Sequence, residues 1–186
     1  MSAAISDDAH DDDTAYELER VRDLVRAVPD YPEPGVLFRD LTPALADAEA
    51  FASLTTELAA RAGNADVVAG VEARGFLIGA AVALVAGTGV VPIRKAGKLP
   101  AVAASRTYDL EYGTATLELP AGTVEPGSRV FVVDDVLATG GTAQAACALL
   151  TEVGAEIVGF GTVIELAALG GRARLGDIAV HSLLTY

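Results

Sequence analysis

The stretch VVDDVLATGGT, residues Val132 to Thr142, ends an apolar run with two adjacent carboxylates and follows them with a Thr-Gly-Gly-Thr turn. Placing like charges side by side costs free energy unless opposite charge or hydrogen bonds compensate for it. The apolar residues before Asp134 predict a buried strand, and the small and apolar residues after the turn predict a helix. A strand, a glycine-rich turn and a helix in this order are typical of parallel α/β sheets.

The same alternation of strand and helix extends in both directions from this stretch. The predicted elements are a strand at 66–71, a buried helix at 75–87, a strand at 89–94, a polar hairpin within 99–120, a strand at 130–135, a helix at 142–153 and a strand at 155–166. Continuous apolar strands joined by helices predict an α/β fold with a mostly parallel central sheet, covered by helices on both faces.

The N-terminal part of the chain has a different pattern. Residues 1–13 hold five aspartates and predict a solvated, disordered tail. A capping box, Thr14-x-x-Glu17, predicts a helix whose apolar spacing continues to Val28, before Pro29 ends it. The prolines of residues 30–43 predict a constrained loop, and a second helix is expected from about Asp47 to Arg61. We expect one domain over residues 14–186, because this length fits a single core.

Composition and charge restrict the class of function. With 52% hydrophobic and 21% charged residues, the chain fits a folded soluble protein. A net charge of −13 speaks against binding to nucleic acid, which needs basic surfaces that neutralise phosphates. One cysteine, Cys147, excludes an internal disulfide and is expected to be a buried small residue. No apolar run approaches the ~20 residues that span a bilayer, and no signal peptide is recognisable, so we expect a cytoplasmic protein.

Three polar motifs follow three of the predicted strands. They are Glu72-Ala73-Arg74-Gly75, the segment RKAGK at 94–98, and the turn after Asp135. RKAGK holds both lysines of the chain, Lys95 and Lys98. In open α/β sheets ligands bind beyond the carboxyl ends of the strands, so the three motifs are expected to meet at one site.

The turn itself predicts a phosphate site of a particular kind. Neither the Walker sequence G-x-x-x-x-G-K-[ST] nor the dinucleotide fingerprint G-x-G-x-x-G is present. Gly140 and Gly141 let the backbone approach a ligand closely, and the amides at a helix N-terminus attract a phosphate. A sugar phosphate held there would bring its two vicinal hydroxyls over Asp134 and Asp135, which supply two acceptors.

VVDDVLATGGT resembles the signature of the type I phosphoribosyltransferases, which bind 5-phosphoribosyl 1-diphosphate. Further stretches resemble the adenine-specific members of that family and cover nearly everything from residue 30 onward: YPEPGVLFRDLTP, GVEARGF, IRKAGKLP, YDLEYGTATLEL, VEPGSRV and VIELAALGGR. The resemblance implies the type I phosphoribosyltransferase fold with a flexible hood hairpin. It also implies the reaction of purine salvage, in which adenine and 5-phosphoribosyl 1-diphosphate give AMP and diphosphate.

The resemblance implies a role for each matching residue at the donor site. The turn would bind the 5′-phosphate through Ala138, Thr139, Gly140, Gly141 and Thr142. Asp134 and Asp135 would face the ribose, and Arg74 would stabilise the charge on the leaving diphosphate. Lys95 and Lys98 would add positive charge there, in this family across a subunit boundary, which implies a homodimer. Magnesium would be held through diphosphate and ribose oxygens and not by the protein directly.

At the acceptor site the family builds the adenine pocket from the segment that matches Val36, Phe38 and Arg39, with Leu166 nearby. Phe38 can stack on a purine, although by residue type alone it would equally fit a hydrophobic core. Glu111, on the hood hairpin, matches the family's general acid/base, and by residue type alone it would fit a solvated hairpin.

Two alternative functions remain open at this stage. One is a hypoxanthine- or xanthine-specific enzyme of the same class. The other is a regulator without catalysis that senses the phosphoribosyl ligand. Such a regulator would need a DNA-binding module, and the thirty or so residues before Tyr31 are acidic.

Overall fold

The computed structural model describes residues 18–109 and 113–186. These residues form two compact units, divided between Glu57 and Leu58. The predicted disordered tail, the Thr14–Glu17 capping box and Glu111 lie outside the described residues.

The first unit contains a small antiparallel hairpin that the sequence did not predict. Residues 18–24 are helical, and the chain then forms β1 (Arg26–Pro29), which pairs with β2 (Leu37–Asp40). The prediction of a helix continuing to Val28 is therefore wrong at its C-terminal end. Val28 lies opposite Phe38 in the hairpin, so strand pairing outweighs the helical spacing of the apolar residues.

Two helices follow the hairpin. The short helix α2 (Thr42–Ala46) begins with a proline in its first turn, where a missing backbone N–H costs nothing. The segment 30–43, predicted as a loop, thus contains β2 and the start of α2. The longer helix α3 (Ala48–Ala62) confirms the second predicted helix, and Leu54 and Leu58 are buried as its spacing indicated.

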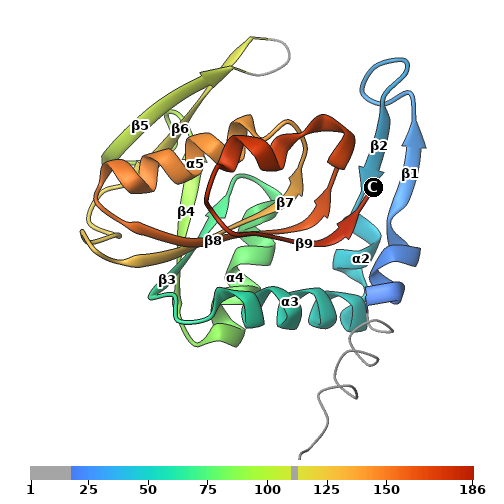
Figure 1. The fold of residues 1–186 in the computed structure, drawn as a ribbon, viewed down its shortest axis with the longest axis horizontal. Helices are drawn as coiled ribbons and strands as arrows, with labels where there is room; N and C mark the ends of the chain where they lie inside the picture. The colour runs from blue at the N-terminus through green and yellow to red at the C-terminus, as the bar shows by residue number, and fades with distance from the viewer. Residues whose placement is uncertain (1–17, 110–112) are drawn as a thin grey trace, which may run out of the picture. The chain divides into compact units, whose positions relative to one another are not determined.

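The second unit is built around a seven-stranded sheet in the order β5-β6-β4-β3-β7-β8-β9 (Figure 1). The strands are β3 (Val67–Val71), β4 (Gly89–Lys95), β5 (Val102–Asp109), β6 (Thr114–Pro120), β7 (Arg129–Leu137), β8 (Glu156–Glu165) and β9 (Val180–Thr185). Strands β4, β3, β7, β8 and β9 are parallel, whereas β5 and β6 are antiparallel. The predicted mostly parallel sheet is confirmed.

Helices α4 (Arg74–Ala86) and α5 (Gly141–Glu152) connect parallel strands and lie on opposite faces of the sheet (Figure 1). Two short 3₁₀ turns, η1 (Ala167–Leu169) and η2 (Gly171–Leu175), lie between β8 and β9. The face under α5 buries Val130, Val132 and Phe160 of the sheet and Leu150 of the helix. Cys147 is buried there as expected, and burial raises the pKa of its thiol to about 12.

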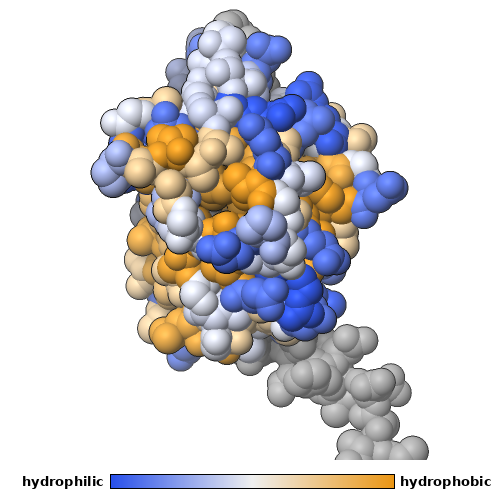
Figure 2. Space-filling view, turned by 90° about the vertical axis from the view of Figure 1, so that its left-hand side faces the viewer, coloured by the Kyte–Doolittle hydropathy of each residue, from blue (hydrophilic) through white to orange (hydrophobic). Residues whose placement is uncertain are grey.

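Helix α4 is buried on only one side. Its Gly75, Ile78, Gly79, Val82 and Ala83 face the sheet. Leu77, Leu84 and Val85 are 58%, 82% and 55% exposed, so the helix predicted to be buried is buried on one side only in the single chain. Exposed apolar side chains also occur elsewhere, and Figure 2 shows orange hydrophobic patches among blue hydrophilic ones on one face.

Candidate active site

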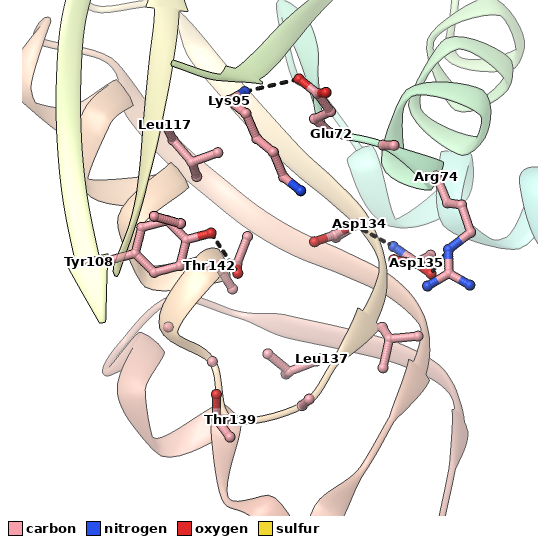
Figure 3. Close-up of a pocket in the computed structure, with 17 residues that line it drawn as sticks. Glu72, Arg74, Lys95, Tyr108, Leu117, Asp134, Asp135, Leu137, Thr139 and Thr142 are labelled. Atoms are coloured by element: carbon pink, nitrogen blue, oxygen red, sulfur yellow. Dashed lines mark hydrogen bonds and ion pairs between the residues drawn. The ribbon is translucent and has the colours of Figure 1, made fainter. Parts of the chain in front are cut away.

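The carboxyl ends of β3, β4 and β7 lie next to one another, and the three polar motifs of the sequence meet there as predicted. They line a pocket of about 460 Å³ (Figure 3). The lining residues are Glu72, Ala73, Arg74, Lys95, Tyr108, Ala115, Leu117, Asp134, Asp135, Val136, Leu137, Ala138, Thr139, Gly140, Gly141, Thr142 and Ala143. Because parallel strands end at the same edge of a sheet, motifs far apart in sequence share one cavity.

The turn between β7 and α5 forms one wall of this pocket. Gly140 is the residue before the helix and has φ +81°, a left-handed conformation that glycine adopts without steric cost. Helix α5 begins at Gly141, so its free backbone N–H groups and the positive end of its dipole lie at the pocket. This arrangement suits a phosphate group.

Asp134 and Asp135 are both buried, with 7% and 8% of their surfaces exposed. Oδ1 of Asp134 accepts a hydrogen bond from the Asp135 backbone N–H at 2.8 Å. Burial and the neighbouring charge of Asp135 raise the pKa of Asp134 well above its usual range, and the charge of Arg74 opposes this only in part. Asp134 therefore holds its proton to a higher pH than an ordinary aspartate and becomes an acceptor-only carboxylate above that pH.

Asp135 has a different partner. The Nε atom of Arg74 lies 2.6 Å from Asp135 Oδ2, which is a close ion pair. The same oxygen is fully buried, yet it accepts no well-directed hydrogen bond from the described residues. We attribute this difference to the angle of approach, since an ion pair needs only proximity whereas a hydrogen bond also needs alignment. The ion pair joins the end of β7 to the first residue of α4.

Glu72 accepts hydrogen bonds from three residues of the RKAGK segment. Its Oε2 accepts from the Lys95 backbone N–H at 2.9 Å and from Arg94 Nε at 3.4 Å, and its Oε1 accepts from Lys98 Nζ at 3.1 Å. Burial acts to raise the pKa of Glu72, but these hydrogen bonds outweigh it and the pKa is lowered. Glu72 thus ties Lys98 to the rim, while the Lys95 side chain extends into the pocket (Figure 3).

Tyr108 and Leu117 are among the pocket residues that sequence reasoning did not identify. Tyr108 of β5 and Leu117 of β6 line the side opposite the Asp pair, and the Tyr108 hydroxyl accepts a hydrogen bond from Thr142 Oγ1 at 3.1 Å. The alternation of TATLEL predicted a hairpin, but it did not indicate that Leu117 would line the pocket.

The residues expected at the acceptor base lie in other parts of the chain. In the first unit, Val36 is exposed, Phe38 and Arg39 are half-buried in β2, and the Phe38 ring packs edge-on against Tyr31 with centroids 5.2 Å apart. In the second unit, Leu166 follows β8 and its backbone N–H donates to the Leu137 carbonyl at 2.9 Å.

The described residues form no cage of side-chain ligands for a metal ion. Among the described residues, no group of three or more histidine, cysteine, aspartate or glutamate side chains is arranged to hold a metal ion. Nor does the described part of the chain contain a helix long and apolar enough to cross a membrane.

The family model of the phosphoribosyl transferase domain matches residues 42–181 of this chain, which include every strand of the seven-stranded sheet except the last four residues of β9. The chain therefore belongs to the phosphoribosyltransferase family. Enzymes of this family are glycosyltransferases that transfer a pentosyl group.

Within the family, relatives named adenine phosphoribosyltransferase match most of the chain. The one from Saccharopolyspora erythraea is 59% identical over 174 residues, covering 94% of this chain and 95% of its own length. The one from Kineococcus radiotolerans is 61% identical over 175 residues, covering 91% and 95%. Both relatives are matched over nearly their whole length.

Solved structures lead to the same group. Adenine phosphoribosyltransferase from Thermoanaerobacter pseudethanolicus superposes with a TM-score of 0.87 at 43% identity, covering 91% of this chain and 99% of that one. The enzyme from Saccharomyces cerevisiae, solved with an imino-altritol bisphosphate and adenine, has a TM-score of 0.85 at 36% identity, with coverages of 91% and 99%.

Proposed function

We propose that this protein is an enzyme of purine salvage that transfers the phosphoribosyl group of 5-phosphoribosyl 1-diphosphate to adenine, giving AMP and diphosphate. The observation that carries the proposal is the union, in one pocket, of a helix N-terminus opened by glycines with a buried carboxylate pair. The relatives named adenine phosphoribosyltransferase supply the choice of base.

The 5′-phosphate, the ribose and the diphosphate of the donor are each assigned to a different group of residues. The amides and hydroxyls of Ala138, Thr139, Gly140, Gly141 and Thr142 bind the 5′-phosphate. Asp134 and Asp135 accept hydrogen bonds from the two ribose hydroxyls. Arg74, Lys95 and Lys98 stabilise the diphosphate as negative charge grows on it. For Arg74 this role requires exchanging part of its contact with Asp135 for the ligand.

The residues at the pocket fit a magnesium ion that is bound mainly through the substrate. Mg²⁺ in such sites keeps several waters and uses one or two carboxylates together with phosphate oxygens. Asp134 and Asp135 are acidic groups at the pocket wall, and Oδ2 of Asp135, which is ion-paired with Arg74 but accepts no well-directed hydrogen bond from the described residues, is an acceptor that a hydrated ion could reach. When bound, the ion would neutralise charge on the diphosphate.

In the first unit, the segment around β2 is assigned to the acceptor base. In the second unit, Leu166 is a further residue assigned to the base. Phe38 offers an aromatic face on which adenine can stack, and Val36 and Arg39 flank it along the chain. In the reaction the adenine N9 atom bonds to ribose C1 as the bond from C1 to the diphosphate oxygen breaks. Glu111 takes the proton from N9 as general base.

The experiment that tests the function is a product assay. Purified protein with Mg²⁺ and 5-phosphoribosyl 1-diphosphate is given adenine, hypoxanthine, xanthine or guanine, and the nucleotides are separated by chromatography. We expect AMP and stoichiometric diphosphate from adenine alone. A preference for an oxopurine would contradict the assignment of the base. Binding of the donor without any nucleotide product would favour a sensor.

We further propose that the protein acts as a homodimer in the cytoplasm. The exposed stripe of Leu77, Leu84 and Val85 on α4 is the surface we assign to the second copy, since a helix apolar on all sides is normally covered. A chain with one cysteine and no disulfide suits a reducing compartment. Residues 14–186 are proposed to form the catalytic domain, and residues 1–13 to be a tail without a catalytic role.

A further inference from the structure

The phosphate-binding turn has a second side, which faces the protein and not the pocket. A Cβ atom on Gly140 would overlap the carbonyl oxygen of Gly171 and lie 3.0 Å from Gly171 Cα. A Cβ atom on Gly171 would overlap the carbonyl oxygen of Ala138 and lie 2.9 Å from Gly140 N. The backbone that opens η2 is thus packed directly against the backbone of the turn, with no side chain between them.

The residue after Gly171 fixes this backbone to the sheet. The Arg172 guanidinium donates from Nε to Glu165 Oε1 at 2.9 Å and from Nη2 to Glu165 Oε2. It also donates from Nη1 to the Val180 carbonyl at 2.9 Å and from Nη2 to Ser182 Oγ at 3.0 Å. Ser182 Oγ in turn donates to Glu165 Oε2 at 2.6 Å. One side chain therefore joins η2 to the ends of β8 and β9.

The carboxylate at the centre of this network is buried and ionised. Glu165 is 6% exposed, and the hydrogen bonds from Arg172 are the main reason that its pKa is lowered despite burial. A bidentate pair of arginine and carboxylate fixes direction as well as distance. Because a buried charge left without its partner is costly, the pair holds its geometry firmly.

The network also lies in register with the turn. Glu165 is the neighbour of Leu137 across the parallel pair β7·β8, and Leu137 is the residue immediately before Ala138. The Leu166 N–H donates to the Leu137 carbonyl at 2.9 Å. The strand leading into the turn and the backbone behind the turn are therefore fixed to the same residue, Glu165.

We propose that Arg172 and Glu165 are positioning residues for the phosphate site. They hold Gly171 against Ala138 and Gly140, so that the amides of the turn keep the arrangement that a 5′-phosphate requires. Neither side chain lines the pocket, so each acts through the backbone. The inference rests on the proposed function only in that the turn binds the phosphate of a phosphorylated ribose.

The test compares two ligands on the same variants. Arg172→Lys loses the bidentate geometry, and Gly171→Ala forces a methyl group into the turn. Affinities for ribose 5-phosphate and for inorganic diphosphate are measured by calorimetry, because diphosphate is assigned to Arg74, Lys95 and Lys98 and not to the turn. We expect both variants to bind ribose 5-phosphate about tenfold to a hundredfold more weakly, as a displacement of about 1 Å can cost. Diphosphate affinity should be unchanged.

Arg129→Lys is the matched control. Arg129 donates to Asp66 at 3.0 Å and ties β7 to its neighbour at the opposite, N-terminal end of the strand. This variant should bind both ligands like the parent. The inference is overturned if the folded Arg172 and Gly171 variants bind ribose 5-phosphate normally. It is also overturned if they lose both ligands together with their melting transition. A parent protein that forms no AMP would refute the proposed reaction while leaving these affinities decisive for the inference.

Discussion

The side chains of Asp134 and Asp135 leave the same strand, β7, in different directions (Figure 3). Asp135 is joined to Arg74 by an ion pair of 2.6 Å, whereas Asp134 accepts from a backbone N–H. Burial, together with the charge of Asp135, raises the pKa of Asp134. Within this carboxylate pair, Asp134 is therefore the acid with the raised pKa, and Asp135 is the acid that forms an ion pair with Arg74.

The raised pKa of Asp134 predicts that binding of the donor weakens at low pH. As pH falls through the raised pKa of Asp134, its carboxylate becomes protonated and accepts the ribose hydroxyls less well, so kcat/KM for 5-phosphoribosyl 1-diphosphate should fall. Asp135→Asn removes the like charge and should lower the pKa of Asp134, which moves the acid limb of the profile to lower pH. The exposed Asp177→Asn variant should leave the limb in place. If the acid limb of the profile lies at the same pH in Asp135→Asn, its assignment to Asp134 is contradicted.

Glu111 is the residue assigned to proton transfer. Glu111→Gln keeps the size of the side chain but cannot accept the N9 proton, so kcat should fall by about 100-fold or more while KM for the donor stays unchanged. Steady-state kinetics with adenine would measure both constants. Glu125→Gln makes the same chemical change at an exposed residue of the loop before β7 and provides the control. Turnover near the parental value would remove the catalytic role of Glu111.

At the level of elements, the pocket depends on how closely α4 approaches the sheet. A Cβ atom on Gly75 would lie 2.9 Å from the Val133 carbonyl oxygen and 3.0 Å from Asp134 Oδ1. Such distances are too short, so a larger residue would push the first turn of α4 away from β7. That turn begins with Arg74, which links the helix to Asp135. Glycine at this position therefore serves the site as well as the packing.

Gly75→Ala should consequently reduce both stability and binding of the donor. Overpacking of this kind costs about 1–3 kcal/mol in the free energy of unfolding, measured by denaturant titration. We also expect a higher KM for 5-phosphoribosyl 1-diphosphate, because Arg74 and Asp134 are displaced together. Gly89→Ala is the control, since its Cβ would meet nothing nearer than Val67 Cγ2 at 3.9 Å. Equal effects of the two substitutions would argue against a close approach at Gly75.

The elements that sequence predicted correctly are those whose local pattern agrees with their partners. The strand ending at Asp135, the turn and α5 were all recognisable, because apolar runs and glycines indicate them directly. The hairpin β1–β2 was not, since Val28 satisfies helical spacing and forms a strand only by pairing with Phe38. The contact of Gly171 with Gly140 joins residues 31 positions apart, and no local pattern reveals it.

At the level of the whole molecule, the proposed homodimer depends on the apolar side chains that α4 exposes. Leu77 and Leu84 are seven residues apart on α4 and therefore share one face of the helix, with Val85 beside them. Leu84 is 82% exposed, which is an unusual environment for a leucine in a helix whose residues after Arg74 are all small or apolar. A self-complementary contact would bury this stripe twice, once from each copy.

Leu84→Glu should therefore convert a dimer into a monomer, because a two-fold contact would bring two unpaired carboxylates into an apolar interface. Sedimentation velocity at several protein concentrations measures the mass directly. Leu169→Glu, which changes a leucine of η1 that is 47% exposed, should keep the parental mass. If lysines of RKAGK act across the subunit boundary, the Leu84→Glu monomer should also lose affinity for diphosphate while its fold, followed by circular dichroism, is retained. A Leu84→Glu protein that remains dimeric would place the interface away from this face of α4, and a parent that is already monomeric would refute the dimer itself.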